Sequence, residues 1–140
     1  MNLRILITGG LGFVGGRLAN HLLQEGHQVV IGSRKATEPP ALLSQAKVEK
    51  IEYDDQAALE NYCYGIDVII HAAGMNAQAC IDNPEAALSF NGEMTARLVT
   101  AANRAGVLRF IYLSTAHVYS NTLQGTVSED SSPHNSHPLC

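Results

Sequence analysis

Cysteine and positive charge are both scarce in this sequence. Its 140 residues include three cysteines, at positions 63, 80 and 140, without the paired spacing of a disulfide framework or a zinc site. Such usage favours a reducing, cytoplasmic environment. The nine Lys and Arg residues form no dense run, and the formal net charge is −4. The sequence therefore lacks the electrostatic footprint expected for nucleic acid or an anionic membrane surface.

Long apolar runs are missing too, since no stretch of the sequence is long enough to span a bilayer. The first apolar segment lies almost at the N-terminus, so we expect no signal peptide ahead of the fold. The composition, with 46% hydrophobic and 16% charged residues, is typical of a globular protein and argues against disorder. A chain of this length can form one domain with a substantial core.

The most informative stretch is ILITGGLGFVG, residues 5–15. An apolar run ends at Thr8, glycines stand at 9, 12 and 15, and an amphipathic segment follows. In a strand–turn–helix unit, such glycines permit a tight turn, let the backbone approach a pyrophosphate and let helix and strand pack closely. The helix N-terminus then offers unpaired N–H groups to the phosphates. A tight turn that binds nothing is the alternative, and the βα units that follow argue against it.

Short apolar runs alternate with helical patterns along most of the chain. The runs that predict strands are residues 3–8, 29–31, 48–53, 67–71 and 109–114. The predicted helices run from Gly12 to Gly26, from an Asp55 cap onward, and from Asn83 to Gly106 with an interruption near Asn91-Gly92. This alternation predicts an α/β fold, a Rossmann-type doubly wound parallel sheet with helices on both faces.

Beyond Tyr119 the composition changes to Ser, Asn, Thr, Gly, Pro and His, which predicts a loop. We therefore expect a folded domain over residues 1–120 and a loop tail over residues 121–140. In a doubly wound sheet the ligand lies beyond the carboxyl ends of the strands, where the strand order reverses. The segments that fall at those ends are residues 8–15, 33–34, 72–76 and 114–115.

Three motifs in register carry a resemblance to a known family. They are TGGLGFVG at residues 8–15, DVIIHAAG at 67–74 and YLSTAHVY at 112–119. Together they resemble the extended short-chain dehydrogenase/reductase superfamily and, within it, the NAD-dependent epimerase/dehydratase family. The resemblance covers the whole chain. It implies hydride transfer between NAD or NADP and a hydroxyl or carbonyl substrate, in many members a nucleotide sugar, and a possible homodimer formed through helices of this domain.

The resemblance also implies which residues would contact the cofactor. Phosphates would lie on the glycine turn, adenine at the end of the third predicted strand, and ribose and nicotinamide beside the small residues after the fourth. The matching positions are Thr8, Gly9, Gly12, Phe13, Val14, Gly15, Glu52, Tyr53, Ala72, Ala73, Gly74, Asn91 and Ser114. Glu52 and Tyr53 have an alternative as a strand-end charge and a core aromatic, and Asn91 as a helix-capping or helix-kinking residue. We expect His71 to be a packed histidine rather than a base or ligand.

Ser33-Arg34 departs from the pattern of members that use NAD. Those members commonly carry an acid at the position of Ser33, which bonds the ribose hydroxyls and would repel a 2′-phosphate. A small hydroxyl followed by Arg34 would instead accept that phosphate, so the pair predicts a preference for NADP. The alternative is that Arg34 and Lys35 are a solvated pair on a loop.

Thr115 falls on the family's catalytic Ser/Thr, whose hydroxyl hydrogen-bonds the reacting substrate oxygen. Its alternative is an ordinary strand-end hydroxyl that satisfies a backbone group. The family's Tyr-x-x-x-Lys pair is absent, because no tyrosine of this sequence has a lysine four residues later. The proton-transfer partner of Thr115 is therefore not in this sequence.

The tail resembles the loop that normally leads into that missing pair. We therefore expect a fragment of a longer enzyme, truncated before the substrate domain. A naturally short, non-catalytic NAD(P)-sensing module acting through a protein partner is the alternative. His134 and His137 stand three apart in this tail without a third ligand cluster, so we predict no metal site.

Overall fold

The computed structural model describes residues 2–119 and 125–135. One five-stranded sheet has the order β3-β2-β1-β4-β5, and every neighbouring pair of strands is parallel. The strands are β1 (Arg4–Thr8), β2 (Gln28–Ser33), β3 (Lys47–Lys50), β4 (Val68–His71) and β5 (Arg109–Tyr112). The chain runs outward from β1 to β3 and then continues on the other side of β1, so the strand order reverses between β1 and β4. This is the predicted Rossmann-type α/β sheet.

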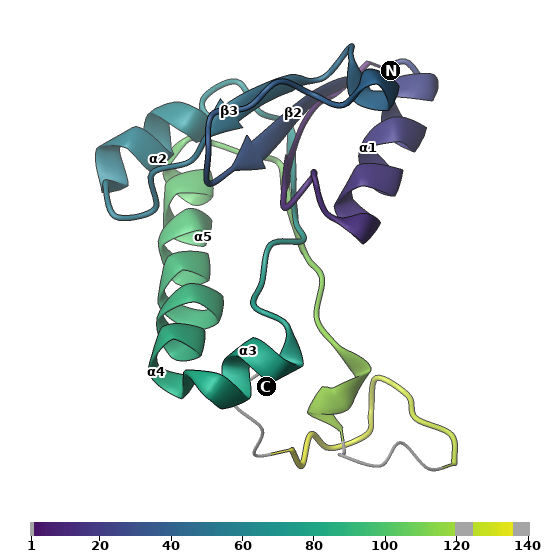
Figure 1. The fold of residues 1–140 in the computed structure, drawn as a ribbon, viewed down its shortest axis with the longest axis vertical. Helices are drawn as coiled ribbons and strands as arrows, with labels where there is room; N and C mark the ends of the chain where they lie inside the picture. Colours follow the sequence, from purple (N-terminus) through teal and green to yellow (C-terminus); the bar gives the residue numbers. More distant parts are fainter. Residues whose placement is uncertain (1, 120–124, 136–140) are drawn as a thin grey trace.

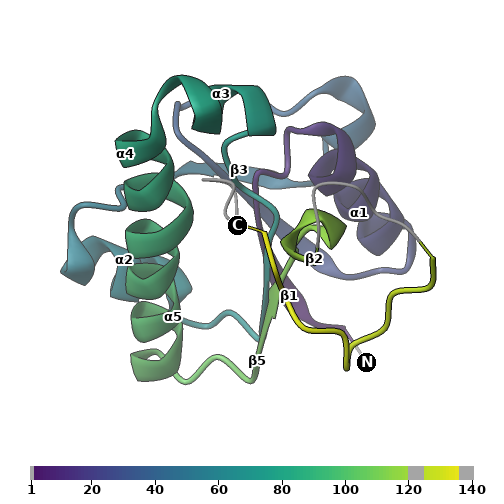
Figure 2. The ribbon, with the colours of Figure 1, turned by 90° about the horizontal axis from the view of Figure 1, so that it is seen from below.

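Helices cover both faces of the sheet, as predicted. Figures 1 and 2 place α1 (Phe13–Gln24) on the opposite side of the strands from α2 (Gln56–Cys63) and α5 (Met94–Arg104). Successive residues of β1 alternate between the two cores: Ile5 and Ile7 join the cluster under α1, and Leu6 joins the cluster under α2 and α5. The inner strands β1, β2 and β4 are therefore largely buried on both faces, which explains their continuous apolar runs, whereas the edge strands β3 and β5 are more exposed.

Two helices begin at the capping residues that the sequence predicted, Asp55 and Asn83. Asp55 Oδ1 accepts a hydrogen bond from the Ala58 amide at 3.0 Å, and Asn83 Oδ1 accepts one from Ala86 at 3.0 Å. Asn83 caps α4 (Pro84–Ala87), which continues through a π-helical segment, η2 (Leu88–Glu93), into α5. The predicted interruption near Asn91-Gly92 is thus a wide helical turn inside one continuous rod.

The C-terminal end that we predicted for the third strand is wrong. We expected residues 48–53, but β3 stops at Lys50, after which the Ile51 amide donates a last bond to the Ser33 carbonyl at 2.8 Å. Ile51 and Tyr53 are nevertheless buried, because the chain bends and points both into the core under α2. Their apolar character reflects this burial and not strand pairing. The fifth strand likewise ends at Tyr112 rather than residue 114.

Several short elements lie between the longer helices and strands. Helix α3 (Ala77–Asp82) begins at Asn76, whose side chain accepts from the Ala79 amide at 2.9 Å. Two short 3-10 helices, η1 (Ala41–Leu43) and η3 (Ala116–Val118), complete the described elements. All three are too short to show an apolar period. Figure 1 shows α3, α4 and η3 extending beyond the sheet on the side where β4 and β5 end.

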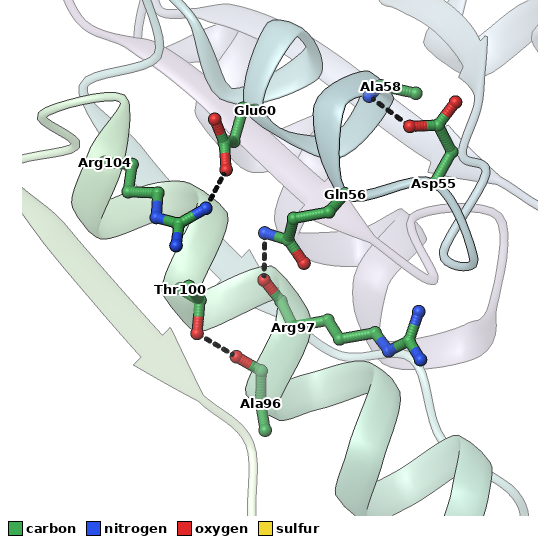
Figure 3. A network of polar contacts seen from close by, with 8 residues as sticks. All are labelled: Asp55, Gln56, Ala58, Glu60, Ala96, Arg97, Thr100 and Arg104. Atoms are coloured by element: carbon green, nitrogen blue, oxygen red, sulfur yellow. Dashed lines mark hydrogen bonds and ion pairs between the residues drawn. The ribbon is translucent and has the colours of Figure 1, made fainter.

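Helices α2 and α5 lie side by side and are joined by both apolar and polar contacts. Leu59, Cys63 and Leu98 are buried between the helices and the sheet. At the surface, Arg104 pairs with Glu60 at 2.6 Å, and the side-chain Nε2 of Gln56 donates to the Arg97 carbonyl at 3.4 Å (Figure 3). Apolar burial therefore holds α5 on the sheet, and the polar contacts set its alignment with α2.

Residues 125–135 contain no helix or strand, as expected for a loop. Hydrogen bonds tie this segment to η3: the His134 and Asn135 amides donate to the Val118 carbonyl at 3.1 and 3.3 Å, and Asn135 Nδ2 donates to the His117 carbonyl at 2.7 Å. The remainder of the predicted tail, including His137 and Cys140, lies outside the described residues. Among the helices that are described, none combines the length and apolarity needed to cross a membrane.

Candidate functional site

Two hollows lie at the carboxyl ends of the strands and share residues 72–76 as a common wall. The larger, of about 790 Å³, is bounded by the glycine turn, the end of β2, Tyr53 and side chains from α3, α4 and η2. The smaller, of about 330 Å³, is bounded by Asn91, residues 112–115 and Val118. Both hollows lie beyond strand ends on either side of the reversal in strand order, where a ligand was expected.

The glycine turn after β1 has a geometry that only glycine accommodates at two positions. Gly9 has a φ of 68°, and a Cβ on it would lie 2.8 Å from the Ala73 nitrogen. A Cβ on Gly15 would lie 2.3 Å from the Gly9 carbonyl oxygen, which is far inside contact distance. The turn is closed by a bond from the Gly12 amide to the Gly9 carbonyl at 2.9 Å. The turn and the close packing of helix on strand are therefore the tasks of these glycines.

No side chain among the described residues caps the first turn of α1. Gly12 is the N-cap and offers no side-chain acceptor, and no acidic residue stands in the first turn. The side chains of Phe13 and Val14 are 77% and 52% exposed, so they do not cover this helix end. Unpaired N–H groups and the positive end of the helix dipole therefore point toward solvent beside the larger hollow, a favourable place for phosphate.

Thr8 and His71 form a buried polar link beneath the turn. Thr8 Oγ1 lies 2.6 Å from His71 Nδ1, and His71 Nε2 lies 2.9 Å from Thr95 Oγ1 on α5. Thr8 Oγ1 also accepts from the Ala73 amide at 3.3 Å. Burial lowers the pKa of His71 to about 4, so the ring is neutral at pH 7. His71 lines neither hollow and is the packed histidine that we expected.

Tyr53, Phe90 and Arg34 form one wall of the larger hollow. Tyr53 is buried, and this burial raises its pKa to about 12 against a smaller lowering by its hydrogen bond with Thr8. Its ring meets the Phe90 ring edge-on, with centroids 6.0 Å apart. The Arg34 Cζ lies 5.6 Å from the Phe90 centroid. Within the described part of the chain, Arg34 is the only charged residue that lines this hollow.

Ser33 lines the same hollow, whereas Glu52 does not. The Ser33 hydroxyl accepts from the Lys35 amide at 3.2 Å, which shapes the loop that presents Arg34. Glu52 is exposed, pairs with Lys50 and lines neither hollow. The location of Glu52 matches the alternative of a strand-end charge. Tyr53, in contrast, is both a core aromatic and part of the wall.

Asn91 ties the shared wall to the π-helical segment. Its Oδ1 accepts from the Met75 amide at 2.9 Å, and its Nδ2 donates to the buried Cys80 sulfur at 3.5 Å. The side chain thus faces the smaller hollow while fixing the loop after β4 against η2. Both sequence interpretations describe part of this arrangement, since Asn91 lies at the hollow and also marks the helix distortion.

Ser114 and Thr115 line the smaller hollow. Thr115 is the N-cap of η3, and its Oγ1 accepts from the His117 amide at 3.3 Å. Its hydroxyl therefore satisfies a backbone group and is also at the edge of the hollow.

Cys63 and Cys80 are buried, and among the described residues no group of three His, Cys, Asp or Glu side chains could hold a metal ion.

The structure brings most of the predicted contact residues to these two hollows. The larger is lined by Gly9, Gly12, Ser33, Arg34, Tyr53, Ala72, Ala73 and Gly74, and the smaller by Ala72, Ala73, Gly74, Asn91, Ser114 and Thr115. Phe13, Val14 and Gly15 belong to the adjoining first turn of α1, and Thr8 lies buried below it. The sequence analysis missed Phe90, although an aromatic residue next to Asn91 in the interrupted helix was the available signal.

The fold and the glycine turn define a Rossmann-type domain of the class that binds dinucleotides. Comparison with known sequences is consistent with this class. The chain matches the sequence model of the NAD dependent epimerase/dehydratase family over residues 5–139, and it belongs to that family.

Curated relatives have several activities. A 3-beta-hydroxysteroid dehydrogenase of Mycolicibacterium neoaurum is 34% identical over 122 residues, which are 82% of this chain and 32% of that protein. A UDP-glucose 4-epimerase of Klebsiella pneumoniae is 30% identical over 139 residues, covering 85% of this chain and 94% of that sequence. The chain thus spans about a third of the length of the dehydrogenase and nearly all of the epimerase sequence.

Solved structures share the fold. A UDP-glucose-4-epimerase from Stenotrophomonas maltophila with bound NAD has a TM-score of 0.87 at 23% identity, covering 99% of this chain and 44% of that one. MoeE5 in complex with UDP-glucose and NAD has a TM-score of 0.79 at 27% identity, covering 97% and 44%. The whole of this chain therefore corresponds to less than half of each of these proteins.

Proposed function

We propose that this chain binds a nicotinamide adenine dinucleotide, with the diphosphate on the first turn of α1. The observation that carries the proposal is the glycine turn, in which a Cβ on Gly15 would lie 2.3 Å from the Gly9 carbonyl oxygen. This close approach of helix and strand leaves backbone donors at the edge of a hollow of about 790 Å³. Solved relatives with bound NAD, such as MoeE5, support the same cofactor class.

The residues present fit such a cofactor along its length. Free N–H groups at the start of α1 suit the phosphates. The aromatic side chain of Tyr53 in the wall of the larger hollow suits a planar base. The small side chains of Ala72 and Ala73, with Gly74, separate the two hollows and leave room for a ribose and a nicotinamide.

We further propose that the chain is the cofactor-binding part of a longer epimerase, dehydratase or reductase. Residues 1–120 would form the domain, and residues 121–140 would lead toward a Tyr-x-x-x-Lys segment. A bound nicotinamide cofactor supplies the hydride acceptor or donor. Thr115 would hydrogen-bond the reacting substrate oxygen from the edge of the smaller hollow. The other catalytic groups, a tyrosine with its lysine, would come from further sequence.

Nucleotide sugars are the substrate class that we propose. UDP-glucose 4-epimerases and a dTDP-glucose 4,6-dehydratase occur among the relatives, and MoeE5 is complexed with UDP-glucose.

We also propose a cytoplasmic protein, supported by the free Cys63 and Cys80. A homodimer through the α4–α5 side is supported by the exposed Leu88 and Val99, at 68% and 43%.

NADP is the form of the cofactor that we propose this chain prefers. Arg34 lines the larger hollow without an ion pair among the described residues, and the neighbouring Ser33 carries no charge that would repel a phosphate. A guanidinium can form charge-assisted hydrogen bonds with a 2′-phosphate. The solved relatives with bound NAD favour the opposite choice, which is a preference for NAD.

Calorimetric titration with NADPH and NADH tests both levels of the proposal. Binding of either coenzyme at micromolar concentration supports the site, and tighter binding of NADPH supports the preference. Absence of binding in a sample that unfolds cooperatively would refute the site. Equal affinities, or tighter NADH binding, would refute the preference alone.

A further inference from the structure

The exposed Arg34 side chain lies over an aromatic ring from a distant segment. Its Cζ is 5.6 Å from the centroid of Phe90, within the range of cation–π attraction. We propose that Phe90 is a positioning residue, which holds the Arg34 guanidinium at the larger hollow and so selects cofactors with a 2′-phosphate. This inference rests on the proposed function, because it names how the same site chooses between two coenzymes.

The Phe90 ring also contacts a second aromatic ring. Tyr53 is 8% exposed and meets the ring edge-on, at an interplanar angle of 65° and a centroid distance of 6.0 Å. Tyr53 itself is fixed within the core cluster under α2 and α5. Phe90 therefore contacts both Arg34 and Tyr53, and the three side chains form one cluster at the wall of the hollow.

The π-helical segment explains how Phe90 reaches this position. Phe90 lines the larger hollow, whereas the next residue, Asn91, lines the smaller one. The Asn91 side chain accepts from the Met75 amide at 2.9 Å, which anchors the segment to the shared wall. π-helical turns occur frequently at functional sites, and this one contributes a side chain to each hollow.

Arg34 needs such a support because nothing else among the described residues restrains its charged end. The side chain is exposed, and it takes part in none of the ion pairs of residues 2–119 and 125–135. A long flexible side chain loses rotamer freedom when it binds a ligand. Pre-positioning on Phe90 reduces that loss, so the Arg34–Phe90 contact should strengthen binding of a 2′-phosphate and leave binding of the rest of the nucleotide unaffected.

Adenosine nucleotides that differ only in the 2′-phosphate provide the test. We would titrate the 140-residue chain with 2′,5′-ADP and with 5′-AMP, and express the result as the ratio of the two affinities. Phe90→Met should reduce this ratio about three- to ten-fold while 5′-AMP affinity changes less than about two-fold. Phe90→Tyr, which keeps the ring, should retain the wild-type ratio, and in an Arg34→Met background Phe90→Met should leave the ratio unchanged.

Glu93→Gln is the matched control and should keep the wild-type ratio, because Glu93 lies on the same π-helical segment, is exposed and lines neither hollow. Phe90→Leu serves as a second variant if Phe90→Met does not unfold cooperatively. An unchanged ratio in the folded variant would overturn the inference. An equal loss for both nucleotides would also overturn it, since Phe90 would then contact the adenosine directly.

Failure of the proposed function gives different results. Wild-type protein that binds neither nucleotide nor either coenzyme would refute the cofactor site itself. Wild-type protein that binds both nucleotides equally would leave the cofactor site in place and overturn the role of Phe90 together with the preference for NADP. A wild-type preference that persists in Phe90→Met would overturn only the positioning role.

Discussion

The Thr8 hydroxyl oxygen lies 2.6 Å from Nδ1 of His71, although 63 positions separate the two residues. This contact joins the ends of β1 and β4, between which the strand order reverses. Thr95 completes the link from α5, at 2.9 Å from His71 Nε2. The glycine turn, the wall of the two hollows and the long helix are therefore connected through one buried, neutral histidine.

The histidine predicts a pH dependence of stability. Burial lowers the pKa of folded His71 to about 4, below the ordinary value of 6.5, so the unfolded chain binds the extra proton first. The stability contributed by neutral His71 is complete above about pH 6.5 and is lost as the pH falls toward 4, by about 3 kcal/mol in total. Urea unfolding at pH 7, 6, 5 and 4 measures this loss.

His71→Gln is the comparison for that measurement. The variant should be less stable at pH 7, because Thr8 and Thr95 lose well-placed partners, and its stability should fall less steeply between pH 6.5 and 4. Parallel stability profiles for the variant and the wild type would show that another group causes the acid sensitivity.

A negative charge at the start of α1 should abolish the phosphate site. Val14 is 52% exposed in the first helical turn, so Val14→Asp should fold, and its carboxylate should weaken NADH and NADPH binding about ten-fold or more by repulsion. Val14→Asn is the matched neutral control and should bind both coenzymes about as well as the wild type. Calorimetry provides the affinities. Equal binding by the Asp variant would mean that the diphosphate lies elsewhere.

The tie between Asn91 and Met75 should control the mobility of the shared wall. Asn91→Ala removes the acceptor of the 2.9 Å bond from the Met75 amide, so exchange of that amide should accelerate about five- to ten-fold. Hydrogen exchange resolved at residues 72–76 measures the effect. Ser89→Ala, which removes only an exposed bond to Glu93, should leave this exchange unchanged. Similar rates in both variants would show that Asn91 does not hold the wall.

Apolar burial, and not the surface ion pair, should dominate the α2–α5 contact. Leu98 is 0% exposed, so Leu98→Ala should cost about 2–5 kcal/mol of unfolding free energy. Arg104→Ala removes the exposed pair with Glu60 and should cost less than about 1 kcal/mol. Denaturant unfolding at low and high salt compares the two. A larger, salt-sensitive loss for Arg104→Ala would contradict this order.

The sequence alone determined the features that depend on local geometry. Gly9 marks a left-handed turn, Asp55 and Asn83 mark helix starts, and alternating apolar runs mark a parallel sheet between two layers of helices. Each of these signals acts within a few residues, through backbone dihedral angles, capping bonds or the spacing of side chains. A reader of the sequence can therefore recognise them before any tertiary contact is known.

Only the tertiary structure decided which of those residues meet. Tyr53 left the predicted strand because burial of its ring under α2 outweighed further pairing of β3. Phe90 gained a place in the wall through a π-helical turn, and Arg34 was brought over it from the other half of the sheet. These outcomes depend on packing between segments far apart in the chain. Packing energy is distributed over many residues, so no single position in the sequence reveals it.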